Sequence, residues 1–180
     1  TGVLRMRSSL RVIRQTITLA RRIGYVRKVL KGDQRAKILE NGPFVVIKTF
    51  LFNKDIDEHG KMTDGFFGSL PKYLRIEGKK VLTLCHINQN FDRLVEQLSK
   101  PSRTHIFPFE WFLTIFDAIK IGLELFIYRP RVEKAIFFDL DVTILVQKEY
   151  WRSGTVVSHF ALSRVGEKLV RSCSLERVIL

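Results

Sequence analysis

Cysteine is scarce in this sequence, and the two that are present, Cys85 and Cys173, form no recognisable pattern. A disulfide framework needs several cysteines, and a zinc site needs ligands at short spacings such as Cys-x-x-Cys or His-x-x-x-His. The sequence contains neither spacing. We therefore expect no disulfide scaffold and no metal site, and the ordinary setting for such a chain is the reducing interior of the cell.

A long uninterrupted apolar run is also missing. The most apolar window, residues 111–128, is interrupted by Asp117, Lys120 and Glu124. A membrane-spanning helix needs about 20 mostly apolar residues, and charges near its centre are costly. We therefore predict no transmembrane helix.

The composition is that of a folded domain. The chain has 180 residues, of which 46% are apolar and 11% are aromatic. This is enough for one ordinary domain with a packed core, or for one half of a two-domain enzyme. Because the sequence begins at Thr1 rather than at a methionine, we expect it to be a piece of a longer protein.

Positive charge is concentrated at the amino-terminal end. The net charge is +13, and residues 1–37 hold eleven basic residues against one acid, Asp33. On a helical wheel, one side of this segment is apolar and the opposite side is basic. The apolar side consists of Val12, Leu19, Ile23, Val26 and Leu30, and the basic side of Arg14, Arg21 and Lys28. Residues 1–40 are therefore predicted to form a basic amphipathic helical segment that ends near Gly32.

Three roles are open for this helix. It packs on the rest of the chain with a solvated basic face, it docks on an anionic membrane surface through Arg14, Arg21 and Lys28, or it binds nucleic acid. Tyr25 is the only aromatic side chain that it offers for base stacking, and no nucleic-acid-binding motif accompanies it. A membrane surface is the favoured specific partner, and nucleic acid is not expected.

The middle of the sequence predicts a strand, a helix and a second strand. Residues 44–52 (FVVIKTFLF) are nearly all apolar, which is typical of a strand buried on both faces. A helix follows, with Ser69 as its cap, Pro71 in its first turn and Gly78 as its stop. Residues 79–87 (KKVLTLCHI) form the second strand. Together they predict one right-handed βαβ crossover.

The second half repeats this alternation. Residues 91–100 have helical spacing, residues 104–110 contain a short strand ended by a proline, and residues 111–126 form a helix. One side of that last helix carries Ile115, Ile119, Gly122 and Phe126. The predicted fold class of residues 41–180 is therefore α/β, a Rossmann-like domain with a mainly parallel sheet and flanking helices, preceded by the basic helix.

The loop before the first predicted crossover helix is a candidate substrate-binding site. Its Gly65, Phe66, Gly68 and Ser69 follow a buried strand and precede a helix start, where ligands bind in parallel α/β sheets. The alternative is that the glycines only turn the chain and the phenylalanines cover the sheet edge. The same loop imitates a calcium loop from Asp55 onward, but Phe66 stands where a glutamate is needed, so no calcium site is predicted.

Residues 135–146 (AIFFDLDVTILV) resemble the first motif of the haloacid-dehalogenase phosphohydrolases. That resemblance implies that Asp139 attacks phosphorus, Asp141 moves the proton and Mg²⁺ stabilises the charge. Val142 replaces the usual glycine, and no acidic pair follows to hold the metal. The alternative is structural, because carboxylates at a helix start satisfy N–H groups and favour the helix dipole.

Two stretches together carry a second resemblance. Residues 46–89 (VIKTFLFNKDIDEHGKMTDGFFGSLPKYLRIEGKKVLTLCHIN) contain a strand, a loop with an aspartate and Phe-Gly-x-Leu-Pro, and a helix leading into Gly-Lys-Lys-Val-Leu. Residues 139–154 (DLDVTILVQKEYWRSG) follow later in the chain. Both are similar to segments of the bacterial and archaeal surface-carbohydrate biosynthesis proteins, which are glycosyltransferases of the two-Rossmann-domain (GT-B-like) type.

This family resemblance implies that the chain is the amino-terminal, acceptor-side half of a glycosyltransferase in cell-surface polysaccharide synthesis. A carbohydrate or a lipid-linked acceptor would be its partner. The nucleotide-sugar donor would be held by a missing second domain, so no cofactor is expected in this half. The expected location is the cytoplasm, peripheral on the inner face of the cell membrane.

The resemblance carries over no catalytic residue position by position, so the candidates come from the predicted strand ends. An acceptor hydroxyl needs a base within hydrogen-bond reach, and parallel strands end at one cleft. Asp64 and His59 follow the first strand, His86 ends the second and Glu110 follows the third. An ordinary role as a solvated or sheet-edge side chain is equally open for each.

Overall fold

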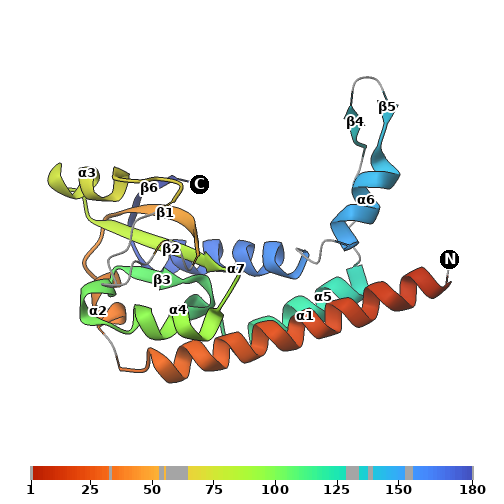
Figure 1. Cartoon of the computed structure of the whole chain (residues 1–180), viewed down its shortest axis with the longest axis horizontal. Coiled ribbons are helices and arrows are strands. Elements are labelled where there is room, and N and C mark those ends of the chain that lie inside the picture. The colour runs from red at the N-terminus through yellow and green to blue at the C-terminus, as the bar shows by residue number, and fades with distance from the viewer. Residues whose placement is uncertain are drawn as a thin grey trace. The chain divides into compact units, whose positions relative to one another are not determined.

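The structure is a computed structural model that describes residues 2–32, 34–52, 55, 65–128, 134–137, 140–152 and 156–179. By its internal contacts the chain divides into two compact units. Unit 1 consists of Thr1–Arg21 and Leu113–Arg164, and unit 2 of Arg22–Phe112 and Val165–Leu180. Two helices, α1 and α7, each contribute residues to both units (Figure 1).

The elements alternate between helix and strand along most of the chain. In order they are α1 (Gly2–Val29), α2 (Arg35–Leu39), β1 (Phe44–Leu51), α3 (Leu70–Ile76), β2 (Val81–Ile87), α4 (Phe91–Leu98), the 3-10 turn η2 (Pro101–Arg103), β3 (Ile106–Pro108), the 3-10 turn η3 (Phe109–Phe112), α5 (Ile115–Tyr128), β4 (Ile136–Phe137), β5 (Leu140–Asp141), α6 (Thr143–Arg152), α7 (Val156–Ser172) and β6 (Leu175–Ile179).

Unit 2 is built on a four-stranded sheet in the order β3-β2-β1-β6, in which every neighbouring pair is parallel. The central pair keeps an unbroken register from Val45 against Val81 to Leu51 against Ile87. Both central strands are buried along most of their length, because their β-branched and aromatic side chains pack on both faces. The predicted α/β class, with a Rossmann-like parallel sheet and flanking helices, is confirmed.

The strand β6 is absent from the predicted elements. Its sequence LERVI mixes charged and apolar residues, and its side chains are exposed or half-buried, as is usual for a strand at the edge of a sheet. It pairs with β1 from Phe44 against Leu175 to Ile47 against Ile179. Since an edge strand buries little, its short sequence lacks the apolar run that identifies a buried strand.

Local signals explain where the crossover helix α3 ends. Gly78, two residues after the helix, has a φ of +78°, a left-handed conformation that glycine adopts without strain and that stops the helix. Ser69 precedes the first helical residue as predicted, but its hydroxyl makes no capping hydrogen bond. The helix start therefore depends on Pro71 in the first turn rather than on a side-chain cap.

The amphipathic character of α1 is confirmed. All five predicted apolar residues are buried, and Arg14, Arg21 and Lys28 are exposed. In unit 2, Val26 and Leu30 join one core cluster with Leu51 of β1, Ile87 of β2 and Leu94 of α4. The carboxyl-terminal part of α1 and α4 therefore cover the same face of the sheet.

In unit 1, α5 begins at Ile115, four residues later than the sequence predicts. Thr114 and Asp117 form a reciprocal cap, in which the Asp117 carboxylate accepts from the Thr114 amide at 2.6 Å and the Thr114 hydroxyl accepts from the Asp117 amide at 3.1 Å. The buried side of α5 consists of Ala118, Ile121 and Leu125. The described part of the chain contains no helix that combines the length and apolar character needed to cross a membrane.

A buried arginine fixes one corner of unit 2. The side chain of Arg35, at the start of α2, is fully buried and donates hydrogen bonds to the carbonyl oxygens of Leu98 at 2.7 Å, Arg103 at 3.1 Å and Ile106 at 3.1 Å. Its guanidinium also lies 5.7 Å from the ring centre of Phe107. One side chain thus satisfies three backbone acceptors in the connection between α4 and β3, where regular pairing is missing.

Replacement of this arginine by an apolar residue should be strongly destabilising. In Arg35→Met three buried carbonyl groups lose their donor, and we expect the free energy of unfolding to fall by roughly 3 kcal/mol, measured by urea unfolding. The matched control is Lys37→Met, two residues along the same helix, because Lys37 is exposed. Equal unfolding midpoints for the two variants would contradict the role given to Arg35.

Candidate functional site

Three neighbouring strands of unit 2 end at one edge of the sheet. Because β1, β2 and β3 are parallel, Leu51 stands beside Ile87, and Pro108 stands beside Cys85. In parallel α/β sheets the loops that follow such strand ends form the ligand-binding crevice. The carboxyl edge is therefore the part of unit 2 in which to look for a site.

Aromatic side chains gather on one face of this edge. The imidazole of His86 lies 4.9 Å from the ring of Phe109 and 5.6 Å from the ring of Phe50, measured between ring centres. Phe66, from the loop after β1, lies 5.6 Å from Phe50 and 6.3 Å from Phe52. We call these five residues the aromatic edge cluster. Phe66 is its outermost member, with 61% of its surface exposed.

A buried carboxylate, Asp55, lies next to the loop that carries Phe66. Asp55 accepts a hydrogen bond from the Phe52 amide at 2.7 Å, which ties the loop to the end of β1. Its other carboxylate oxygen would lie 3.1 Å from a Cβ atom placed on Gly65, so a larger residue there would require the Asp55 side chain to shift. Gly68 has a φ of +53°, which glycine also favours. The conformation and packing of the loop thus explain both glycines. They flank Phe66, whose ring lies at the carboxyl edge of the sheet.

The start of α3 contributes less than the sequence suggests. The helix has only seven residues, and Ser69 is exposed at its start without a capping hydrogen bond. Of the four predicted substrate-binding residues, Gly65 and Gly68 shape the loop, Ser69 lies beyond it, and Phe66 alone joins the ring contacts of the cluster.

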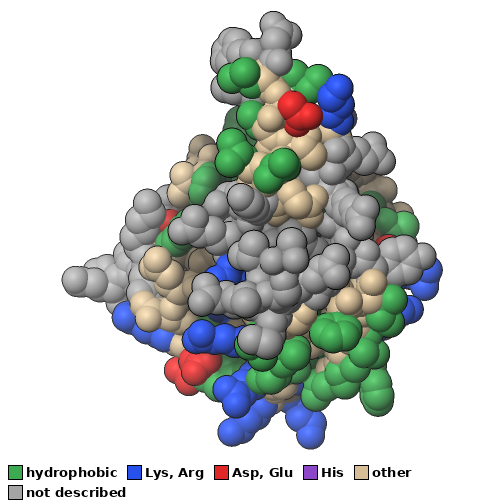
Figure 2. Space-filling model, turned by 90° about the vertical axis from the view of Figure 1, so that its right-hand side faces the viewer, with side chains coloured by type: hydrophobic (Ala, Val, Ile, Leu, Met, Phe, Trp, Pro, Cys, Tyr) green, Lys and Arg blue, Asp and Glu red, His purple; other side chains and the backbone are tan. Residues whose placement is uncertain are grey.

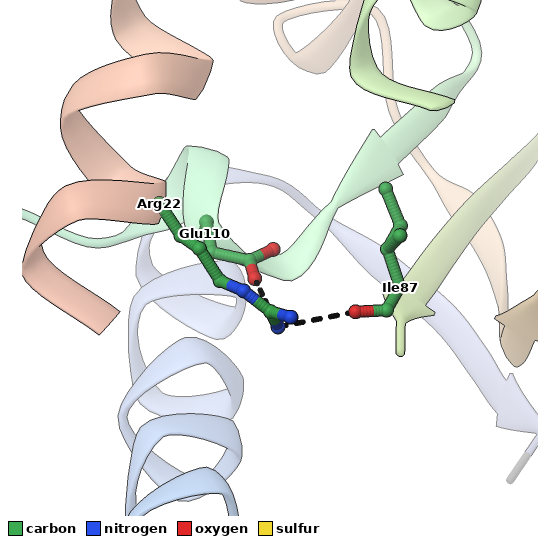
Figure 3. A network of polar contacts seen from close by, with 3 residues as sticks. All are labelled: Arg22, Ile87 and Glu110. Atoms are coloured by element: carbon green, nitrogen blue, oxygen red, sulfur yellow. Dashed lines mark hydrogen bonds and ion pairs between the residues drawn. The ribbon is translucent and has the colours of Figure 1, made fainter. Parts of the chain in front are cut away.

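A charged pair occupies the other side of the same edge. Glu110, in η3 directly after β3, is fully buried, and its Oε1 lies 3.6 Å from Nη1 of Arg22 on α1. The same nitrogen donates a hydrogen bond of 3.1 Å to the carbonyl oxygen of Ile87 at the end of β2 (Figure 3). The Arg22 guanidinium also lies 4.5 Å from the ring centre of Phe91. Neither Glu110 oxygen has a hydrogen-bond partner within the described part of the chain.

This environment changes the acidity of Glu110. Burial raises the pKa of its carboxyl from 4.5 to about 7, while its own backbone amide and the positive charge of Arg22 limit the rise. A carboxyl group with a pKa near neutrality exchanges a proton readily at physiological pH, which is the property that general acids and bases share.

The two described catalytic candidates, His86 and Glu110, lie on different sides of the sheet edge. His86 stands between Cys85 and Ile87, whose side chains belong to the core cluster beneath α1 and α4. Since side chains alternate along a strand, His86 points to the opposite face, where it meets the aromatic residues. Glu110 instead meets Arg22 of α1.

The remaining candidates lie either outside the described residues or in unit 1. His59, Asp64 and Asp139 lie outside the described residues. Asp141 is exposed in the two-stranded antiparallel ladder β4–β5 of unit 1, and its Oδ1 accepts from the Thr143 amide at 2.9 Å. Hydrogen bonds from Thr143 lower the pKa of Asp141. The Asp141 carboxylate thus accepts a backbone N–H at the start of α6, as the structural alternative for this motif expects.

The described residues contain no group of three or more histidine, cysteine, aspartate or glutamate side chains that could hold a metal ion. The phosphohydrolase alternative stays a prediction, because Asp139 is not described. Comparison with known proteins identifies no relative, since no protein-family model, no curated protein and no solved structure matches the chain.

The sequence alone does not predict two residues of the site. Arg22 lies at the border between the apolar and basic sides of α1, so its position on the wheel is compatible with a side chain that turns inward. Asp55 follows a buried strand directly and is followed by further acids, a pattern that indicates solvated loop residues rather than a buried carboxylate.

The raised pKa of Glu110 predicts a pH-dependent stability. Because the folded chain holds this proton more tightly than the unfolded chain, the stabilisation is complete below pH 4.5 and is lost as pH rises through about 7. The loss should be on the order of 3 kcal/mol in wild type. Glu110→Gln cannot titrate, so its free energy of unfolding should vary less over this range in urea titrations at a series of pH values.

The control is Glu77→Gln, which changes an exposed acid of the same unit. That variant should keep the wild-type pH profile. A Glu110→Gln profile parallel to wild type would show that Glu110 does not titrate as described.

Proposed function

We propose that this chain is the acceptor-side half of a glycosyltransferase of the two-Rossmann-domain type, acting in cell-surface polysaccharide synthesis. The observation that carries the proposal is the aromatic edge cluster, with the exposed ring of Phe66 at the carboxyl edge of a parallel sheet. Aromatic rings offer flat apolar surfaces, and binding sites combine them with a few polar groups that fix orientation. The apolar face of a sugar ring suits such a surface.

Within this proposal, His86 is the better base among the described candidates. It is half-buried and shares a face with Phe66, so an acceptor on the aromatic surface would come within its reach. Glu110 is fully buried against α1, and its position suits a residue that orders the strand ends together with Arg22. The roles of base and of positioning residue are therefore assigned to different sides of the edge.

The other parts of the proposal concern partners and location. The nucleotide-sugar donor would be held by a second Rossmann-like domain. The acceptor would be a carbohydrate or a lipid-linked acceptor, and the protein would act in the cytoplasm at the inner face of the membrane. The resemblance of residues 46–89 to the surface-carbohydrate biosynthesis proteins is the basis for expecting this donor domain and this acceptor.

Carbohydrate binding tests the proposal. A glycan array of short oligosaccharides should show retention by the wild-type chain, and the best glycan should bind about tenfold more weakly to Phe66→Ala in calorimetry. The matched control is Phe116→Ala, because Phe116 is an exposed phenylalanine on α5, in the other unit. That variant should bind the glycan as wild type does.

Two results would reject the proposal. The first is a wild-type chain that retains no carbohydrate, or whose affinity is the same in Phe66→Ala. The second is Mg²⁺-dependent hydrolysis of p-nitrophenyl phosphate that disappears in Asp139→Asn, which would establish the phosphohydrolase alternative.

A further inference from the structure

Unit 1 exposes an unusual number of large apolar side chains on two of its helices. Nine of them have between 47% and 82% of their surface exposed. We call them the α1–α5 apolar surface; its members are Leu10, Ile13 and Ile17 on α1, and Ile115, Phe116, Ile119, Leu123, Phe126 and Ile127 on α5. Soluble monomers rarely expose large apolar side chains in such contiguous groups unless the surface binds something.

The two helices bring these side chains to one side. Thr16 of α1 faces Gly122 of α5 so closely that a Cβ atom on Gly122 would lie 2.8 Å from the threonine hydroxyl. The helices run antiparallel along this contact (Figure 1). On each helix the exposed apolar side chains lie next to the contact, on the side away from its buried residues. The two exposed sides therefore form one continuous surface.

Positive charge borders this surface. Arg14 and Arg21 lie beside the apolar side chains of α1, and Lys120 lies beside those of α5; all three are exposed. Figure 2 shows hydrophobic side chains gathered at the lower edge next to lysine and arginine side chains.

The two acids of α5 both have other partners. Asp117 caps its own helix through Thr114, and Glu124 pairs with Arg164 of α7. On the helical wheel both lie on the other side of α5 from Ile115, Ile119 and Phe126. No aspartate or glutamate occurs in residues 1–32, so α1 brings no negative charge to the surface.

We propose that the α1–α5 apolar surface binds an anionic lipid bilayer, with both helices lying in the plane of the membrane. Apolar side chains flanked by basic residues are the pattern of interfacial helices, whose binding adds burial of apolar area to attraction by anionic headgroups. A second copy of this chain is a less favourable partner for the surface, because two chains of net charge +13 with the same basic border repel each other. This inference does not depend on the glycosyltransferase proposal.

The surface differs from the one that the sequence predicts. The predicted docking face consists of the basic residues alone, with Arg14, Arg21 and Lys28 touching headgroups. The structure adds an apolar area from a second helix, so charge selects the membrane while the apolar side chains of α5 enter it. Removal of charge and removal of apolar area should therefore have different effects.

Sedimentation with vesicles tests both contributions. The wild-type chain should bind phosphatidylcholine vesicles that contain phosphatidylglycerol and bind pure phosphatidylcholine much less. Leu123→Ser combined with Phe126→Ser should weaken binding to the anionic vesicles by tenfold or more. Arg14→Gln combined with Arg21→Gln should remove most of the preference for anionic vesicles.

Matched controls come from unit 2. Tyr73→Ser with Ile76→Ser removes as many large exposed side chains from α3, and Lys37→Gln with Lys72→Gln removes as many exposed charges. Both should leave vesicle binding unchanged, as should Phe66→Ala, which separates this inference from the carbohydrate proposal. Far-ultraviolet circular dichroism checks that each variant is folded.

Three outcomes would overturn the inference. One is a wild-type chain that binds neither kind of vesicle. Another is an equal loss of binding in the α5 variant and in its α3 control. The third is a concentration-dependent dimer in analytical ultracentrifugation that disappears in the α5 variant, which would identify a second copy as the occupant.

Discussion

The carboxyl edge of the sheet depends on one side chain, Arg22. Its guanidinium extends from α1, donates a hydrogen bond to the carbonyl of Ile87 and lies beside Glu110. A single cation thus joins the end of β2 to the turn after β3. A buried carboxylate is unfavourable without such a partner, and the positive charge keeps its pKa from rising further. The helix that carries Arg22 also supplies Val26 and Leu30 to the core beneath the sheet. The same few turns of α1 therefore cover one face of the sheet and hold the ends of its strands.

Much of this fold is predictable because its strongest signals are local. The apolar runs of β1 and β2 identify buried strands, Gly78 marks the end of α3, and the wheel of α1 finds its buried side. Local signals are insufficient where both sides of a helix are apolar or where a strand is exposed. In α5, the side with Ile115 and Ile119 is as apolar as the buried side with Ala118 and Ile121, so hydrophobicity alone does not tell which side faces the core. The exposed β6 lacks an apolar run altogether.

The candidate site is only partly predictable for a different reason. The ends of strands are visible in the sequence, and they give His86 and Glu110 as candidates. Which side chains share a face depends on register and on long-range contacts, so the meeting of Phe50, Phe66 and His86 is not visible in any local pattern. The same limit applies to the apolar surface of unit 1, because it arises only when α1 and α5 lie side by side.

The hydrogen bonds of Arg35 have a consequence for local motion. Because one guanidinium donates to the carbonyls of Leu98, Arg103 and Ile106, these three backbone groups share one hydrogen-bond partner. If the Arg35 side chain moves away, all three carbonyl groups lose this donor at the same time. The free-energy cost of that movement is therefore the cost of losing three hydrogen bonds together. The connection between α4 and β3 should therefore unfold locally as one cooperative unit.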